Sequence, residues 1–453
     1  MKQVTATWPR LIPIGLAVLL MGASAVERLP LIDAARNSDP AAVRALLKQG
    51  ADVNATDADG TTALLWASYR DDVETARLLL RAGANVNASN DLGATPIWTA
   101  SLNGSTAMVR TLLEAGANPN LALLRGETPV MVAARSGNPA VVEQLLAKGA
   151  NVNSRGARGQ TALMWAVAQK HSEVVKLLLA HGADVHARSD VWSQMMAVPP
   201  HGRPEYNSMI PHGSDTALMF AARGGDVTSA KLLVAAGAKV NDADAWGVSA
   251  TVLAAHAGHG ELVEFLLENG ADPNSASAGF SALHAAVMRR DEKMVGALLA
   301  RGADPNAPVR TWTPTRRSSN DFHFGPALVG ATPVWLAARF SMPGIMRLLV
   351  KHGANPLFVH RVEYHAEGGT ARSEATTALM AATGMGGGTA WVQPDRSERE
   401  SLTLETVKLT VELGVDVNAA NRDGRTALDA AKAQKYETVV AFLIDKGARS
   451  GKN

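Results

Sequence analysis

The sequence predicts an all-α solenoid of about eleven helix–turn–helix units with β-hairpin fingers, several of them enlarged by insertions. Three observations predict this architecture. A glycine-alanine turn returns every 33 residues, at Gly50, Gly83, Gly116, Gly149 and Gly182. A leucine-rich segment precedes each turn, and a segment of the form Gly-x-Thr-[Ala/Pro]-Leu, or a close variant, opens each unit. A fixed period of this length is typical of stacked repeats, in which each unit buries its apolar face against its neighbours.

The first 25 residues have the layout of a secretory signal peptide. Lys2 and Arg10 supply positive charge, "LIPIGLAVLLMG" is a short apolar run, and Ala23 and Ala25 offer a small-residue cleavage site. The run is too short for a comfortable membrane span. We therefore expect cleavage, export to the periplasm or outside the cell, and no stable membrane span afterwards. An uncleaved N-terminal anchor is the alternative.

Composition and charge restrict the function of the remaining chain. Removal of Lys2 and Arg10 from the 44 basic residues leaves 42, equal to the 42 acidic residues. A chain near neutrality has no global field that would draw it to nucleic acid, so we expect no nucleic-acid partner. The absence of cysteine excludes disulfides, thiolate zinc sites and cysteine nucleophiles.

Each unit of the array, residues 26–449, is expected to begin with a capped helix, except the first unit, which lacks this opening. A Thr or Ser side chain can accept a hydrogen bond from the free amides of the first turn, and Ala or Pro follows at the first helical position. The glycine of each turn is expected to end the second helix in the left-handed conformation. The expected capping residues are Thr62, Thr95, Thr128, Thr161, Thr216, Ser249, Ser281, Thr332, Thr377 and Thr426.

The repeated pattern resembles the ankyrin repeat family. "GFSALHAAV" at Gly279 keeps the family's histidine as His284, and "AGHGELVEFLLENGADPN" is close to the family consensus. The likeness covers Leu29 to about Arg449 and leaves residues 450–453 as a C-terminal tail. It implies a non-catalytic scaffold without a cofactor that binds a protein partner on its concave face, where first helices and finger tips lie. We expect this scaffold to be monomeric.

Four insertions interrupt the regular spacing. From the last residue of a turn to the next cap the distance is normally 8 positions, as from Asn54 to Thr62, but it is 30 positions from His186 to Thr216. The first three insertions enlarge fingers and are expected to project toward the concave side. The fourth falls between the two helices of one unit, so we expect it at the opposite end of the helices. The insertions lie near residues 187–213, 307–329, 358–375 and 385–402.

The insertions are rich in aromatic, histidine and arginine side chains, which are typical anchors of protein interfaces. We therefore expect partner contacts there and at the tip residue Trp246. The alternative is that the loops pack on one another and their aromatic rings form a small core. The expected partner-binding residues are Trp192, Arg203, Tyr206, Trp246, Arg310, Trp312, Arg316, Arg317, Phe322, His323, Phe324, His360, Tyr364, His365 and Trp391.

A hydrolase, or a small-molecule or carbohydrate binder built from the insertions, is the alternative function. The segment "HRVEYH" places His360, Glu363 and His365 within six residues. Histidine and glutamate side chains are ligands that suit zinc, but their spacing here matches no metal-binding motif. "GMGGGT" at Gly384 is similar to a phosphate-binding loop but lacks its Gly-Lys-[Ser/Thr], and we interpret it as a flexible excursion. The sequence assigns no catalytic, cofactor-binding or metal-binding residue.

Overall fold

Paired helices make up the architecture in the computed structural model, which describes residues 29–451 apart from 197–206, 314–322, 367–368 and 396. Twenty-two α-helices in this part of the chain form eleven consecutive pairs, which confirms the predicted units. The expected signal peptide lies outside the described residues. The first helices of the pairs are α1 (Pro30–Arg36), α3 (Ala63–Tyr69), α5 (Pro96–Asn103), α7 (Pro129–Ser136), α9 (Ala162–Ala168), α11 (Ala217–Gly224), α13 (Ala250–Ala257), α15 (Ala282–Met288), α17 (Pro333–Arg339), α19 (Ala378–Ala382) and α21 (Ala427–Gln434).

The second helices follow the first after two or three residues, except in the tenth unit, where the fourth insertion intervenes. They are α2 (Pro40–Lys48), α4 (Val73–Arg81), α6 (Thr106–Glu114), α8 (Pro139–Ala147), α10 (Ser172–Ala180), α12 (Val227–Ala235), α14 (Gly260–Glu268), α16 (Glu292–Ala300), α18 (Pro343–Lys351), α20 (Arg399–Glu412) and α22 (Glu437–Asp445).

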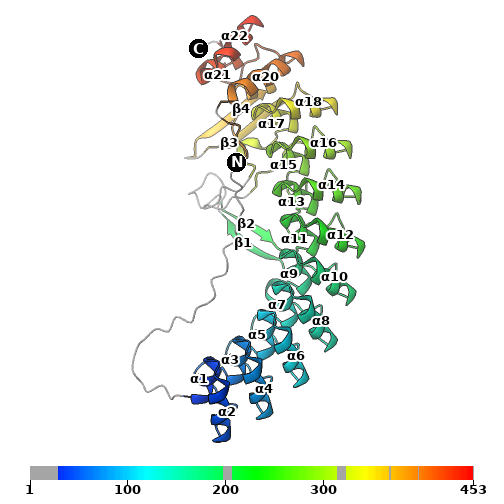
Figure 1. Ribbon diagram of the computed structural model, residues 1–453. Helices are drawn as coiled ribbons and strands as arrows, with labels where there is room; N and C mark the ends of the chain where they lie inside the picture. The colour runs from blue at the N-terminus through cyan, green and yellow to red at the C-terminus, as the bar shows by residue number, and fades with distance from the viewer. Residues whose placement is uncertain (1–28, 197–206, 314–322, 367–368, 396, 452–453) are drawn as a thin grey trace, which may run out of the picture.

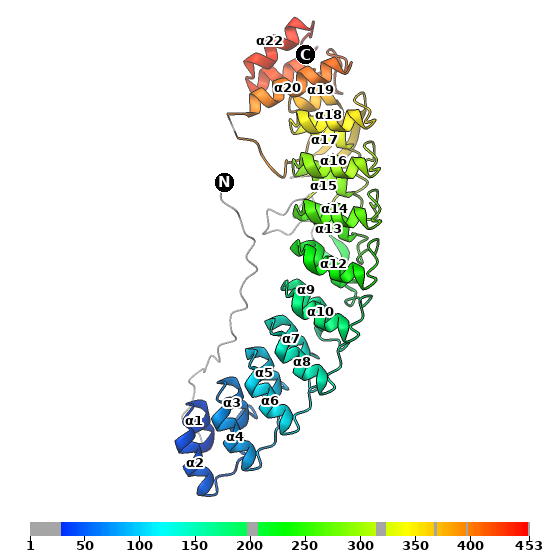
Figure 2. The ribbon, with the colours of Figure 1, turned by 45° about the vertical axis from the view of Figure 1, so that its right-hand side comes forward.

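The pairs stack into one curved array, with the first helices on the inner side and the second helices on the outer side (Figures 1 and 2). Leucine pairs of the second helices, such as Leu266 and Leu267, are buried in a core that runs through the stack. The bulk of the stability of such an array comes from these contacts between neighbouring units. Among the described helices none is long and apolar enough to cross a membrane.

Every predicted capping residue occupies the N-cap position of a first helix. At α3, for example, the Thr62 hydroxyl accepts a hydrogen bond from the Leu65 amide, 3.2 Å away. Ser281 and Thr426 begin capping boxes, in which His284 and Asp429 accept from the N-cap amide. The turn glycines also adopt positive φ angles as predicted, between 80° and 94°, which disfavour residues with a Cβ. These local signals explain why the helix boundaries are so regular.

A ladder of asparagine side chains connects successive turns on the outer side of the fingers. The Asn54 side chain donates to the Gly83 carbonyl at 3.3 Å and accepts from the Asn85 amide at 2.7 Å. The same pair of bonds recurs along the array. In the described part of the chain it is missing at two places, where His186 and Leu357 replace the asparagine. The remaining ladder residues are Asn87, Asn120, Asn153, Asn241, Asn274, Asn306 and Asn418.

Two of the enlarged fingers form antiparallel hairpins. The first contains β1 (Trp192–Met196) and β2 (Ser208–His212), and the third contains β3 (Val359–His365) and β4 (Ala371–Thr377). Both hairpins lie on the inner side of the array, as expected (Figure 1). The second enlarged finger contains a 3₁₀ turn over Pro326–Leu328.

The fourth insertion does not lie where the sequence predicted it. Its glycine-rich part returns to the concave side, and Gly386 contacts the Trp335 ring while Gly388 contacts Leu328. The physical reason is burial, because Trp391 in the same segment packs into the aromatic side chains of the second enlarged finger. The expectation of a flexible excursion at the opposite end of the helices is therefore wrong.

Candidate functional site

The first enlarged finger forms one wall of a cleft on the concave surface. Trp192 and His212 are directly paired across β1 and β2, and their rings stack with centroids 4.5 Å apart and an interplanar angle of 21°. The guanidinium carbon of Arg158, at the preceding finger tip, lies 4.3 Å from the Trp192 ring. A cation over an indole face is attracted electrostatically, so the hairpin is held to its neighbour.

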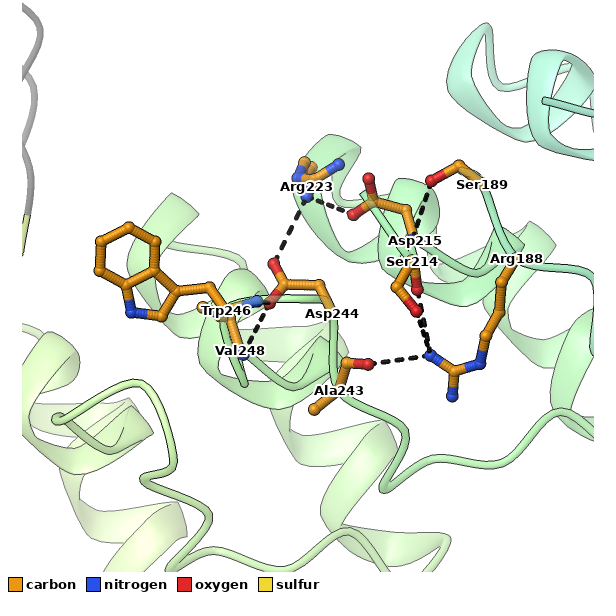
Figure 3. A network of polar contacts seen from close by, with 9 residues as sticks. All are labelled: Arg188, Ser189, Ser214, Asp215, Arg223, Ala243, Asp244, Trp246 and Val248. Atoms are coloured by element: carbon orange, nitrogen blue, oxygen red, sulfur yellow. Dashed lines mark hydrogen bonds and ion pairs between the residues drawn. The ribbon is translucent and has the colours of Figure 1, made fainter. Parts of the chain in front are cut away.

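Arg188 fixes the base of this hairpin (Figure 3). Its Nη1 donates to the main-chain oxygen and hydroxyl of Ser214, both at 3.1 Å, and to the Ala243 carbonyl at 2.9 Å. Its Nη2 also lies 2.8 Å from the Asp242 carboxylate. Arg188 therefore joins the fifth unit to the next finger at the position where His186 interrupts the asparagine ladder.

Two carboxylates and one guanidinium lie on the floor of the cleft (Figure 3). Arg223 Nη2 is 2.5 Å from Asp215 Oδ1 and 4.0 Å from Asp244 Oδ2. Asp244 Oδ1 accepts from the amides of Trp246 and Val248, both at 2.9 Å. Burial is the main cause that raises the pKa of Asp244, and the charge of Asp215 acts in the same direction. Burial therefore makes the Asp244 carboxylate costly to charge, and a further positive group beside it would stabilise the ionised form.

An aromatic cluster forms the opposite wall. The Phe324 ring lies 5.0 Å from that of Phe280 and 4.9 Å from that of Trp391, while His256 lies 5.0 Å from Trp391. Trp391 Nε1 donates to the His323 carbonyl at 2.8 Å. Three segments that are far apart in the sequence thus pack together, which is the alternative that the sequence left open for the insertion loops.

The walls and the floor enclose a cleft of about 630 Å³. This volume falls within the range of pockets that bind small molecules or peptide side chains. Three carboxylates line it, from Asp190, Asp215 and Asp244, against the two guanidiniums of Arg158 and Arg223. Aromatic side chains make up much of the remaining surface, namely Trp192, His212, Phe220, Trp246, His256, Phe280 and Phe324.

The hairpin beside the cleft exposes apolar side chains. Met195 and Met209 are directly paired across β1 and β2, and their side chains are 57% and 53% exposed. Val191, just before β1, is 63% exposed. Methionine adapts its shape to different partners, and an apolar patch that water surrounds is a frequent feature of binding surfaces.

The third enlarged finger is mainly structural. His360 is fully buried, its ring centroid lies 4.3 Å from that of Trp335, and its Nε2–H donates to the Val329 carbonyl at 2.9 Å. Burial lowers the pKa of His360, so the ring is neutral at physiological pH. The Tyr364 hydroxyl donates to Glu374 at 2.9 Å, and burial together with this carboxylate raises the pKa of Tyr364 to about 12.

The expected partner-binding residues are divided among several locations. Trp192, Trp246 and Phe324 line the cleft. His360 is fully buried against Trp335, so the expectation that it contacts a partner is wrong. Phe324, at the back of the cleft, is also fully buried against Trp391 in the folded chain. The half-buried Trp312, His323, Tyr364 and Trp391 and the exposed Arg310 and His365 lie outside the cleft lining. The candidates Arg203, Tyr206, Arg316, Arg317 and Phe322 lie outside the described residues.

Sequence reasoning missed the charged floor of the cleft. Asp215 directly precedes the Thr216 cap, and Arg223 lies in the last turn of α11. In the sequence, each therefore has the pattern of an ordinary residue at the end of a helix. Asp244 belongs to a finger of regular length. Their positions in the sequence were the available signal, because Asp215 follows the first insertion and Arg223 and Asp244 belong to the unit that comes next. In the described segments, no group of three or more His, Asp or Glu residues is arranged to hold a metal ion.

The repeated helix pairs, their capped first helices and the finger-built cleft define a helical repeat protein with a concave binding surface. The chain belongs to the ankyrin repeat family. A model of three ankyrin repeats matches residues 31–123, 118–189 and 211–309, and a single-repeat model matches residues 329–361. The first two enlarged fingers fall between the matched ranges.

One solved structure is similar in sequence to part of this chain. The crystal structure of the human ASB11 ankyrin repeat domain is 31% identical and covers 54% of this chain and 100% of that domain, with a TM-score of 0.45. Ankyrin repeats generally mediate protein–protein interactions, and their family is typically non-catalytic.

Proposed function

We propose that this protein is an exported, monomeric, non-catalytic scaffold that binds another protein through the concave cleft and its first enlarged finger. The membership in the ankyrin repeat family supports a protein partner. The observation that carries the proposal is the exposed Met195–Met209 pair beside an aromatic cleft. An apolar patch next to a charged pocket is the arrangement that anchors interfaces.

The lining of the cleft indicates what the partner presents. Asp190 already pairs with Arg155 at 2.8 Å. Asp215 and Asp244, in contrast, share the single guanidinium of Arg223. A positive group from a partner would stabilise the ionised form of Asp244, whose pKa burial raises. Aromatic faces beside these carboxylates also attract cations. We propose that an extended partner segment inserts a lysine or arginine side chain into the cleft and places apolar residues on the methionine pair.

Export rests on the first 25 residues, whose layout is that of a signal peptide. The balance of 42 basic and 42 acidic residues after removal of Lys2 and Arg10 supports a partner other than nucleic acid. N-terminal sequencing of the protein recovered outside the cytoplasm tests this part of the proposal. A mature chain that begins at Val26 is expected, whereas a chain that retains Met1 would contradict it.

The binding experiment compares two surfaces of the same array. A photo-reactive residue at Met209 is expected to crosslink one protein, and mass spectrometry locates a basic residue of that protein near the cleft. Met195→Ser reduces the yield at least about tenfold because it removes an apolar anchor. Leu124→Ser, which changes a 77% exposed side chain at an N-terminal finger tip, is the matched control and leaves the yield unchanged.

The opposite result would overturn the proposal. If Leu124→Ser abolishes crosslinking and Met195→Ser does not, the partner binds the regular fingers. If neither variant changes the yield, the capture does not depend on either surface.

A carbohydrate or another small molecule is the second candidate ligand. The volume of about 630 Å³ and the two indole rings of Trp192 and Trp246 favour it. Trp192 already contacts both His212 and Arg158, which leaves less of its ring for a sugar. Quenching of tryptophan fluorescence by oligosaccharides, lost in Trp246→Ala, would support this candidate in place of a protein partner.

A further inference from the structure

A second pocket lies at the glycine-rich part of the fourth insertion, between α19 and α20. Its volume is about 280 Å³, and it is separate from the cleft because the two share no lining residue. The ends of α17, α19 and α21 and the start of α20 contribute to it. Polar residues around it include Arg339, Thr389, Gln393, Arg399 and Gln434.

The charge of this pocket is entirely positive. Arg339 and Arg399 line it, and no aspartate or glutamate is among its lining residues. Arg339 Nε donates to the Gly386 carbonyl at 3.0 Å, which holds the side chain against the glycine-rich turn. Within the described part of the chain neither guanidinium forms an ion pair.

The carboxylate of Glu374, whose charge acts on Arg339, already has two hydrogen-bond partners. Glu374 accepts from the Tyr364 hydroxyl at 2.9 Å and from the Gly387 amide at 3.1 Å. Burial lowers the pKa of Arg339, and Glu374 only partly opposes this effect. An isolated cation in such a place is costly unless an anion accompanies it.

Backbone donors complete the arrangement. Gly384, Gly386 and Gly388 have φ angles of +98°, +85° and +89°, and such alternation at every second residue is typical of turns that present successive amides to an anion. The amides of Gly388, Thr389 and Ala390, all in the pocket lining, donate to no protein acceptor among the described residues.

We propose that this pocket binds a small anion that carries a phosphate or carboxylate group. The planar guanidiniums of Arg339 and Arg399 bind its oxygens, since arginine matches both groups in geometry. The amides of Gly388–Ala390 supply further donors. The volume of about 280 Å³ suits a single small molecule, and the pocket shares no lining residue with the cleft, so this ligand is separate from the protein partner of the cleft.

Calorimetric titration of the purified protein with inorganic phosphate, and separately with succinate, tests the proposal. Both titrations are made in chloride buffer at constant ionic strength. We expect saturable binding with a dissociation constant of millimolar or lower for at least one of the two anions, and the preferred anion identifies phosphate or carboxylate as the recognised group.

Arg399→Gln is the informative variant because Arg399 is exposed and its loss leaves the core intact. It is expected to weaken binding at least tenfold. Arg110→Gln removes the same charge from an exposed position on α6 and is expected to bind as the unchanged protein does. Absence of saturable binding of both anions at 10 mM would overturn the proposal, as would equal affinities of the two variants. Crosslinking through Met209 is unaffected by Arg399→Gln, so the two proposals fail independently.

Discussion

Trp391 Nε1 donates a hydrogen bond of 2.8 Å to the main-chain oxygen of His323, a residue 68 positions earlier in the chain. This bond fastens the fourth insertion to the second enlarged finger. The rings of Phe324 and His256 surround the same indole. The second enlarged finger and the fourth insertion therefore form one connected surface.

Trp391→Ala is expected to loosen this surface. Loss of a half-buried indole and its hydrogen bond costs about 2 kcal/mol of local stability. Hydrogen exchange of residues 309–313 and 323–330 is expected to become faster, with the N-terminal units unchanged. Val392→Ala, at an adjacent and 37% exposed side chain, is the control. Unchanged exchange in Trp391→Ala would show that the finger holds its shape without the insertion.

His186→Asn is expected to stabilise the array. The new side chain can donate to the Gly237 carbonyl and accept from the Lys239 amide, as Asn153 does with Gly182 and Asp184. We expect a gain of about 1 kcal/mol, which thermal unfolding can detect. The reverse change, Asn153→His, is expected to lower the stability by a similar amount. A loss in Asn153→His without a gain in His186→Asn would mean that the fifth and sixth units are too far apart for this bond.

Arg188→Ala is expected to release the base of the first hairpin. The change removes contacts with Ser214, Asp242 and Ala243. Because the side chain is 37% exposed, we expect a cost of only about 1 to 3 kcal/mol. Protease cleavage within residues 189–215 should become faster, while Arg77→Ala on the exposed side of α4 should leave the rate unchanged. Equal rates in both variants would contradict a tethering role for Arg188.

His284 is expected to make the stability depend on pH. Burial lowers the pKa of His284 to about 4, compared with 6.5 in an unfolded chain. The unfolded chain therefore binds the proton first as the pH falls. The contribution of the neutral ring is fully present above pH 6.5 and is lost as the pH falls toward about 4, with a cost between pH 7 and pH 4.5 of about 2 to 3 kcal/mol.

Urea unfolding of the unchanged protein and of His284→Gln at pH 7 and pH 4.5 measures this contribution. His259 and His360, whose pKa values burial also lowers, remain in both proteins. The variant is expected to lose less stability on acidification. An equal loss in both proteins would show that His284 does not titrate on unfolding in this range.

The sequence predicted the regular part of the fold because its signals are local. A capping hydroxyl such as that of Thr62 acts on an amide three residues away, and a turn glycine acts on its own backbone. Counting positions between turns and caps also located the insertions. None of these signals depends on contacts between distant segments.

The site was harder to predict because its contacts are distant in sequence. Trp391 meets His323 only because two insertions end at the same place on the array. The burial of His360 could have been predicted from the alternation of side chains along β3. His360 and Val362 are buried, whereas Arg361 and Glu363 between them are exposed. Trp66 and Trp165 are half-buried, and the guanidiniums of Arg36 and Arg135 lie over their rings.

The two gaps divide the asparagine ladder into three runs, and they lie at His186 and Leu357, where the two hairpins emerge. At the first gap, contacts of Arg188 with Asp242 and Ala243 connect the fifth unit to the next finger instead. The cleft spans this gap, with Arg158 on one side and Phe220 and Trp246 on the other. We therefore expect a ligand that binds across the cleft to connect the two runs and to limit bending between them.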